Sequence, residues 1–384
     1  MKSLIKNTFA WALMATSALT VVSCDDDNKS ENNNEFNADQ QAVLTNYVNG
    51  VVVPTYRSLA DAAILLAEDC ADLSTQAKVD KACQDWKAAR QYWELSEAFL
   101  FGAASDYLID PHIDSWPLDL AQLDKVLKDG NIEEMIEAGT AGNGLLGFHA
   151  VEYIIFKEGS TGDFQNRCRT YTEISEAEAN FAKAVAEDMR DQCIHLEASW
   201  AGLDNVSNEK QEILADAELE PSLNYGDLII AAGLNGNAKF KTQAAAFEEI
   251  LVGASDIANE VGNTKISDPM DSHKWADVES PHSWNSVTDF IDNIKSVRNA
   301  YFCSLDGKES KQSVSSVIAK ADAAKDAAIK EKLSAAIAAL EAMPTPFRNY
   351  INNEDAAATA KINAAVEACN ELVKAIEAAQ EVLN

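Results

Sequence analysis

An imidazole and a carboxylate lie three residues apart in the apolar hexapeptide GFHAVE, residues 147–152. If this segment is helical, His149 and Glu152 share one face, with roughly 5–6 Å between their Cβ atoms. Two side chains of these types can hold one metal ion, and burying either without a partner would be costly. The pair therefore predicts part of a metal site, whose other ligands must come from elsewhere in the chain. A core histidine with satisfied hydrogen bonds is the plainer alternative.

A second segment with ligand chemistry is ARQYWELSEAFLFG, residues 89–102. Glu94 and Glu97 are again three residues apart, and the four residues after Glu97 are apolar, so we expect Glu97 to point inward. Facing helices in bundles build iron and manganese sites from carboxylates and imidazoles. A hard or borderline cation such as iron suits these ligands better than it suits thiolates. We therefore predict His149, Glu152 and Glu97 as ligands of a metal ion.

Five further side chains are predicted to support this pocket. Asp114 shares a loop with Trp116, whose ring can wall a cavity, and Arg90 can pair with an acid or bind an anionic ligand. The supporting set is Glu94, Arg90, Asp114, Trp116 and Ser283. No catalytic residue is predicted.

Helical periodicity dominates the elements that must position these residues. Besides the helix that carries His149, helices are expected over 40–66 (kinked at Pro54), 75–101, 118–127, 132–138, 173–200, 238–261, 284–300, 312–343 and 355–383. Loops are expected over 103–117 and 139–147, and a polar linker over 201–224. Long alternation of period two is missing. The sequence therefore predicts an all-α protein of two helical bundles packed side by side, with the motif in residues 38–200 and the second bundle in 201–384.

The N-terminal segment resembles a bacterial lipoprotein signal. Lys2 and Lys6 precede an apolar stretch that is too short to span a bilayer as a mature helix, and the stretch ends in VVSC at Cys24. We predict a signal peptide over 1–23, lipidation of Cys24 and a flexible tether over 24–37. A plain secretory signal cut near Ser23 is the alternative. The predicted location is the cell envelope, with a lipid anchor in the outer membrane and the protein facing the periplasm or the cell surface.

Composition excludes some partners. The chain has 384 residues, of which 47% are hydrophobic, and this is enough for two domains. Its formal net charge of -31 repels nucleic acid and anionic lipid headgroups. We therefore expect no nucleic acid partner and contact with the membrane through the N-terminal lipid anchor only.

The cysteines give two disulfide options. No C-x-x-C pair occurs, so a thiolate zinc site is not predicted. In an oxidising compartment, Cys70 could pair with Cys83 and Cys168 with Cys193. Buried free thiols are the alternative of equal weight.

The glycines before His149 spell a dinucleotide-binding motif, G-x-G-x-x-G, at residues 142–147. That motif functions between a strand and a helix, and the segment before it is helix-like. We expect the glycines to allow a tight turn and close backbone packing beside His149 instead.

Together these segments resemble the imelysin-like family, named for an insulin-cleaving metalloproteinase and including iron-regulated lipoproteins. The matches are the family's G-x-H-x-x-E at 147–152, its R-x-x-W-E-x-S-E-A-F-x-F-G helix at 90–102, its I-D-x-x-I-D-x-W-P loop at 109–117, and its C-terminal segments at 257–266 and 279–286. The resemblance implies two helical bundles with the histidine motif at their interface, export to the envelope and a link to iron or haem acquisition. Trp284 departs from the family pattern, where a smaller polar residue is usual.

Three functions follow. The first is an envelope lipoprotein that binds a metal ion or an iron-bearing ligand, with iron favoured by the resemblance and with envelope iron-uptake proteins as partners. The second is a metallopeptidase of the imelysin type. Zinc proteases use H-E-x-x-H, whereas Ala150 follows His149 here, so no adjacent glutamate activates a metal-bound water. The third is a structural or partner-binding lipoprotein with a buried polar network.

Overall fold

The computed structural model describes residues 36–159, 162 and 167–383. The predicted signal peptide, the lipidation residue Cys24 and all but the last two residues of the predicted tether lie outside the described residues. Asn37, assigned to the tether, caps the first helix, α1 (Ala38–Tyr47), because its side chain accepts the N–H groups of Asp39 and Gln40. Asn37 therefore belongs to the first helix as its cap, one residue before the predicted start of the bundle at residue 38.

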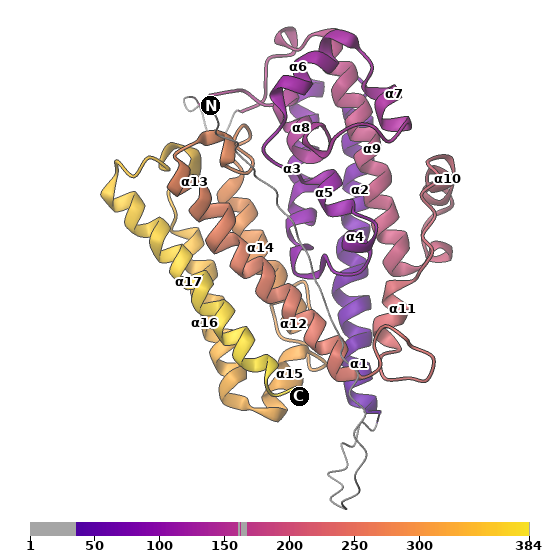
Figure 1. Ribbon diagram of the computed structural model, residues 1–384, viewed down its shortest axis with the longest axis vertical. Helices are drawn as coiled ribbons and strands as arrows, with labels where there is room; N and C mark the ends of the chain where they lie inside the picture. Colours follow the sequence, from indigo (N-terminus) through magenta and orange to yellow (C-terminus); the bar gives the residue numbers. More distant parts are fainter. Residues whose placement is uncertain (1–35, 160–161, 163–166, 384) are drawn as a thin grey trace, which may run out of the picture. The chain divides into compact units, whose positions relative to one another are not determined.

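The all-α prediction is confirmed. The described residues form helices and no β-strand, and the extended pairing among them is a single antiparallel bridge between Phe156 and Cys168. Figure 1 shows the helices as two groups, with the N-terminal helices in indigo to magenta and the C-terminal helices in orange to yellow.

The N-terminal group is built on four helices: α2 (Val53–Cys70), α3 (Gln76–Glu94), α8 (Gly147–Ile155) and α9 (Glu176–Ala201). Helix α2 packs against both α3 and α9, and the shorter α8 packs against α3 and α9. A π-helical turn, Val48–Val52, joins α1 to α2, and Pro54 is the second residue of α2, directly after this turn.

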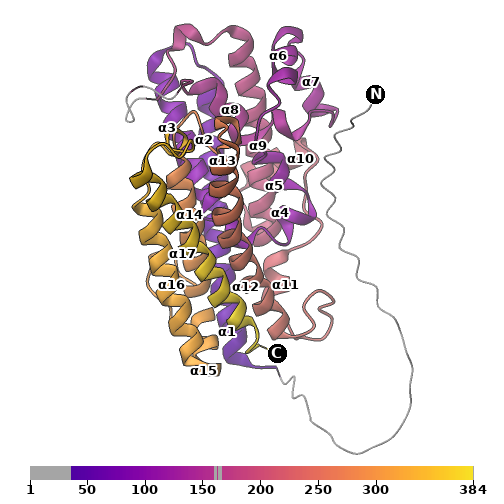
Figure 2. The same ribbon diagram turned by 60° about the vertical axis from the view of Figure 1, so that its left-hand side comes forward.

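The C-terminal group is built on α12 (Gln243–Glu260), α14 (Ser286–Phe302), α16 (Ala323–Glu341) and α17 (Ala356–Gln380). Helix α14 contacts α3 of the first group, while α16 and α17 pair with each other. In Figures 1 and 2, α16 and α17 lie on the side of α12 and α14 that faces away from α3. The described residues from Phe36 onward form one compact unit, and the division into domains after residue 200 stays a prediction.

Several shorter helices correct the predicted loops. The segment 103–117 contains α4 (Ala103–Asp106) and α5 (Ile109–Ile113), and the predicted linker contains α10 (Asn208–Asp216). The predicted helix over 312–343 is divided at Asp322, whose side chain caps the first turn of α16. The remaining short helices are α6 (Leu120–Asp129), α7 (Ile132–Glu137), α11 (Tyr225–Ile230), α13 (Ser267–Ser272) and α15 (Val314–Ala321).

The end of α3 matters for the site. A single helix was expected over 75–101, but α3 ends at Glu94 and a 3-10 turn, Glu97–Phe99, follows. The hydroxyl of Ser96 donates to the carbonyl of Trp93 at 2.7 Å, which satisfies one of the carbonyls freed at the helix end. The spacing suggested that Glu94 and Glu97 lie on one turn of one α-helix. They do not, because Glu94 ends α3 and Glu97 begins the 3-10 turn.

The helical run Ala38–Cys70 is long and apolar enough to cross a membrane by length and composition. More than half of its most apolar window, 56%, is buried inside the protein. Packing against α3 and α9 marks it as a core helix.

Candidate metal centre

A buried cluster of charged side chains lies where the two helix groups meet. Its members come from α3, from the turn after it, from the end of α5, from α8, from a π-helical turn (Val261–Ile266), from the loop before α14 and from α14 itself. Each is at most 6% exposed: Arg90, Glu94, Glu97, Asp114, His149, Glu152, Lys265, Glu279 and Asp289. Charged groups so deeply buried are retained only where they are paired or bind ions.

Gly147 sets the position of α8 against the segment that carries Asp114. Its φ is +73°, and a Cβ at this position would lie 2.0 Å from the carbonyl oxygen of Ile113. Only glycine permits this approach. The contact brings His149 Nε2 to 3.2 Å from Asp114 Oδ1.

Glu152 contacts the other ring nitrogen of His149, with 3.3 Å between Nδ1 and Oε2. Its second oxygen, Oε1, accepts the backbone N–H of His282 at 3.0 Å and both the N–H and the hydroxyl of Ser283 at 2.7 Å. Burial opposes ionisation, but the hydrogen bonds from His149 and Ser283 outweigh it and lower the pKa of Glu152 to about 2. Glu152 therefore holds the orientation of the ring as an ionised carboxylate.

The His149 ring has one nitrogen to spare. Among the described residues, Nε2 has no aligned hydrogen-bond partner, although the side chain is only 3% exposed. Burial lowers the pKa of His149, but the carboxylates of Asp114 and Glu152 outweigh it and raise that pKa to about 9. The imidazole is thus poised to hold a proton or another cation at Nε2.

Arg90 forms ion pairs with several of the carboxylates around His149. Its Nη2 lies 2.5 Å from Glu94 Oε1 and 2.6 Å from Glu279 Oε1, and Nη1 pairs with Asp114. Trp93 Nε1 also donates to Asp114, at 2.6 Å. Asp114 remains ionised because the Arg90 guanidinium outweighs burial and holds the pKa of Asp114 well below its usual range.

Lys265 supplies the second permanent cation, which the sequence did not indicate as a site residue. Its Nζ lies 3.0 Å from Glu279 Oε1, 3.6 Å from Glu97 Oε1 and 3.7 Å from Glu94 Oε2. It sits on the π-helical turn after α12, a distortion that is frequent at functional sites. Glu97 thus faces Lys265.

Acids outnumber permanent cations in the cluster. The buried carboxylates are Glu94, Glu97, Asp114, Glu152, Glu279 and Asp289, against the guanidinium of Arg90 and the ammonium of Lys265. Burial raises the pKa of Glu94 and Glu97 well above the usual range, and that of Asp289 to about 7. The excess negative charge must be balanced by protons or by an added cation.

Two groups of donor atoms are close enough to hold a metal ion. Within each group the candidate ligand atoms lie within 4.8 Å of one another; the groups are Asp114, His149 and Glu279, and Glu94, Glu97 and Asp114. Within the described residues, the predicted set of His149, Glu152 and Glu97 does not form one such group. Glu152 lies on the Nδ1 side of the ring, away from the other acids, and this geometry separates its role from that of a ligand at Nε2.

A narrow cavity of about 40 Å³ reaches His149 and Glu152. Trp116, Trp275 and His282 wall it, and the Trp116 ring lies 6.0 Å from the His149 ring. Trp116 Nε1 donates to the carbonyl of Asp277 at 3.3 Å, which fixes the ring across the two groups. The volume is enough for one or two water molecules, and therefore for a small ion.

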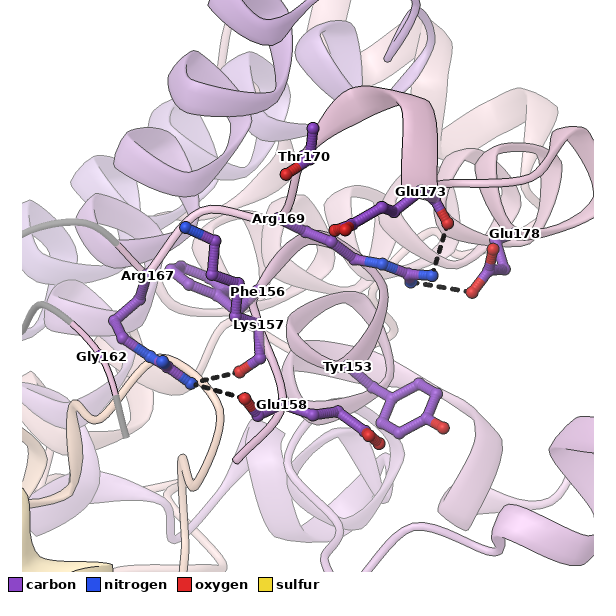
Figure 3. A pocket seen from close by; sticks show the side chains of 10 residues that line it. All are labelled: Tyr153, Phe156, Lys157, Glu158, Gly162, Arg167, Arg169, Thr170, Glu173 and Glu178. Atoms are coloured by element: carbon purple, nitrogen blue, oxygen red, sulfur yellow. Dashed lines mark hydrogen bonds and ion pairs between the residues drawn. The ribbon is translucent and has the colours of Figure 1, made fainter. Parts of the chain in front are cut away.

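A larger cavity of about 610 Å³ lies beyond the C-terminal end of α8 (Figure 3). Its arginines are committed to structural contacts, because Arg167 donates to the carbonyl of Lys157 and Arg169 to the carboxylate of Glu178. Neither arginine of this cavity is therefore without a partner.

Comparisons with known proteins identify the family and the fold. The family model of imelysin matches residues 52–376. Iron-regulated protein A of Synechococcus elongatus is 28% identical over 269 residues, which cover 68% of this chain and 65% of that protein. The crystal structure of an iron-regulated protein A precursor from Parabacteroides distasonis has a TM-score of 0.75 at 25% identity, covering 92% of this chain and 97% of that one. An imelysin-like protein from Psychrobacter arcticum, at 11% identity and a TM-score of 0.56 over 91% and 94% of the two chains, shares the fold.

Proposed function

Because this chain belongs to the imelysin family and is related to iron-regulated protein A, we propose that it binds one metal ion in the service of iron acquisition. The ion is held by His149 Nε2 together with the carboxylates of Asp114 and Glu279, and Glu152 orients the imidazole from Nδ1. The observation that carries the proposal is the buried Nε2, which has no aligned hydrogen-bond partner among the described residues and lies within reach of the carboxylates of Asp114 and Glu279. The His149 side chain also lines a small cavity.

The donor set fits iron(II) or manganese(II). One imidazole and two carboxylates are borderline and hard ligands, which these ions prefer over the thiolates that favour copper(I) or zinc. Glu279 Oε2 is also a buried atom without a hydrogen-bond partner in the described part of the chain. Its other oxygen is held by Arg90 and Lys265, so the carboxylate is oriented before an ion arrives.

The cavity favours a bare or hydrated ion over haem. Pockets for ligands of drug size and above measure roughly 300–1,000 Å³, whereas the cavity at His149 measures about 40 Å³. A porphyrin would require Trp116 and Trp275 to move apart.

The same geometry argues against the peptidase alternative. A polypeptide does not enter a cavity of this size, and Glu152 is a poor general base because its pKa is lowered to about 2. The structural alternative, a purely buried polar network, accounts for the contacts of Arg90 and Lys265 and for a protonated His149 beside Asp114, but it leaves Glu279 Oε2 without a hydrogen-bond partner among the described residues.

We place the protein at the cell envelope as a lipoprotein anchored through Cys24, where it passes iron to, or receives it from, envelope iron-uptake proteins. The lipobox-like VVSC sequence and the acidic segment after it support this location. The proposal includes no nucleic acid partner.

Metal analysis of the purified protein tests the proposal. Wild type incubated with manganese(II), or anaerobically with iron(II), should retain about one equivalent after desalting, and His149→Ala should retain none. His112→Ala is a matched control, because that imidazole pairs with Asp188 and is not part of the cluster. Equal metal content in wild type and His149→Ala would refute the site.

Three glutamine variants then separate ligands from supporting residues. Glu279→Gln should abolish binding, whereas Glu152→Gln should weaken it 10–100-fold, as the loss of an orienting carboxylate does. Glu97→Gln should change the affinity little, since Glu97 faces Lys265. If Glu152→Gln and Glu97→Gln abolish binding while Glu279→Gln does not, the ligands are those that the sequence spacing suggested.

A further inference from the structure

Two cysteines that are distant in the sequence converge beside the C-terminal end of α8. Cys83 lies on α3, and its Sγ donates to the carbonyl of Ile155 at 3.3 Å. The backbone N–H of Arg169 donates to the same carbonyl at 2.8 Å, and Cys168 forms the antiparallel bridge with Phe156. The neighbour of Cys168 in the chain, Arg169, therefore binds the same carbonyl as the Cys83 thiol, and this places Cys168 beside Cys83.

This pairing differs from both pairings that the sequence offered. All six cysteines in the described part of the chain are free thiols, so neither the Cys70–Cys83 nor the Cys168–Cys193 bond is formed. Cys70, Cys83 and Cys193 are buried, whereas Cys168 is partly exposed. A thiol pair with one accessible member can react with a reagent from solution.

The two thiols also differ in reactivity. Burial raises the pKa of the Cys83 thiol, and its hydrogen bond with the Cys168 thiol raises it further. The same hydrogen bond lowers the pKa of Cys168. Because the thiolate is the nucleophile, Cys168 is the member that attacks first.

We propose that Cys83 and Cys168 form a disulfide when the protein meets a disulfide donor, such as oxidised glutathione or an oxidised dithiol protein. The Cys168 thiolate attacks one sulfur of the donor, forms a mixed disulfide and releases the first donor thiolate. The Cys83 thiol then gives up its proton, attacks the Cys168 sulfur and displaces the second donor thiolate. The two cysteine protons pass to the two released thiolates, so both cysteines are oxidised and the donor is reduced to two thiols.

The bond would tie the wall of the metal centre to α3. Cys168 lies between Arg167 and Arg169, whose side chains bind the chain on either side of α8's end (Figure 3). Arg167 Nε donates to the carbonyl of His282 at 3.1 Å, and its guanidinium carbon lies 3.8 Å from the centre of the Trp284 ring. The segment of His282 in turn holds Glu152. The cross-link thus fixes a support of the site, although its formation does not depend on metal binding.

Peptide mapping of the oxidised protein tests the proposal. The wild-type protein is incubated with oxidised and reduced glutathione, alkylated without reduction, digested and analysed by mass spectrometry. A peptide joining Cys83 to Cys168 should appear and should disappear after reduction. Cys70→Ser is the matched control and should still give it, because it removes a buried thiol that belongs only to the alternative pairing.

Thermal unfolding gives a second, independent measurement. The bond closes a long loop, so reductant should lower the Tm of oxidised wild type by roughly 3–6 °C and leave the Tm of Cys168→Ser unchanged. Full alkylation of both cysteines after the oxidised glutathione treatment would overturn the proposal. A Cys70–Cys83 or Cys168–Cys193 peptide would overturn it equally.

Discussion

Metal affinity should rise steeply with pH, because the proton on His149 competes with the ion for Nε2. The pKa of this imidazole is raised to about 9 from an ordinary value of 6.5. Well below pH 9 each pH unit lowers the competition from the proton about tenfold, and at pH 9 half of the rings still carry it, so the apparent affinity should increase roughly 160-fold from pH 6.5 to 9. Over the practical range of pH 6.5–8.5 the expected gain is about 80-fold.

The assay is titration with manganese(II), which stays soluble over this range, followed by calorimetry or by competition with a chelator. Ionisation of Glu94 and Glu97, whose pKa values are also raised, adds to the slope. The Glu97→Gln variant removes one such acid, so the slope that remains in it reports more closely on His149. A pH-independent affinity, or one that falls between pH 6.5 and 8.5, would refute the proton competition at Nε2.

The metal-free protein should show the opposite trend in stability, with a sign fixed by the same pKa. Because the folded pKa of His149 lies above the ordinary value, the charged ring adds at most about 3 kcal/mol to the free energy of unfolding below pH 6.5, and this contribution is lost as pH rises through 9. Urea unfolding at pH 6.5 and at pH 9 measures the difference, and His149→Ala should remove it. Gly147→Ala should lower the free energy of unfolding by about 3 kcal/mol or more, since alanine is strained at φ +73° and its Cβ meets the Ile113 carbonyl; an unchanged urea midpoint, with Gly139→Ala as the positive-φ control in open space, would contradict this. Arg90→Met should cost about 3–5 kcal/mol by leaving buried carboxylates uncompensated, and saturating manganese(II) should restore part of the loss; a variant as stable as wild type without metal would show that the cluster is protonated throughout.

The helical architecture could be predicted because it rests on periodicity within each segment. The ends of helices were less predictable, and α3 shows why. Nothing in ELSEAF breaks a helix by propensity, and α3 stops at Glu94 because Ser96 binds the carbonyl of Trp93 while Asn293 of α14 donates to the carbonyl of Glu94. One of these contacts comes from a residue about 200 positions away, which local spacing cannot reveal.

The candidate site divides along the same line. His149 and Glu152 were singled out from the residues themselves, because ionisable groups in an apolar run need partners. Asp114 was predicted as a supporting residue because it shares a loop with Trp116. Glu279 and Lys265 were present in segments that matched the family, but no spacing rule links either of them to α8. Glu97 was expected to point inward because apolar residues follow it, and it is buried. It lies with Glu94 and Asp114 rather than with His149 and Glu152, and it faces Lys265.

The charge balance of the cluster joins the binding and structural hypotheses. Arg90 and Lys265 each pair with acids from both helix groups, so the network holds the groups together whether or not an ion is present. Two permanent cations cannot neutralise six carboxylates. The remaining negative charge is reduced by protons on Glu94, Glu97 and Asp289, whose pKa values are raised, and by the proton on His149. In the function proposed above, an entering ion would displace the proton of His149 and bind ligand atoms that the network already holds together. On this view the cost of gathering acids in the interior is borne by the fold, and it is recovered when the ion binds.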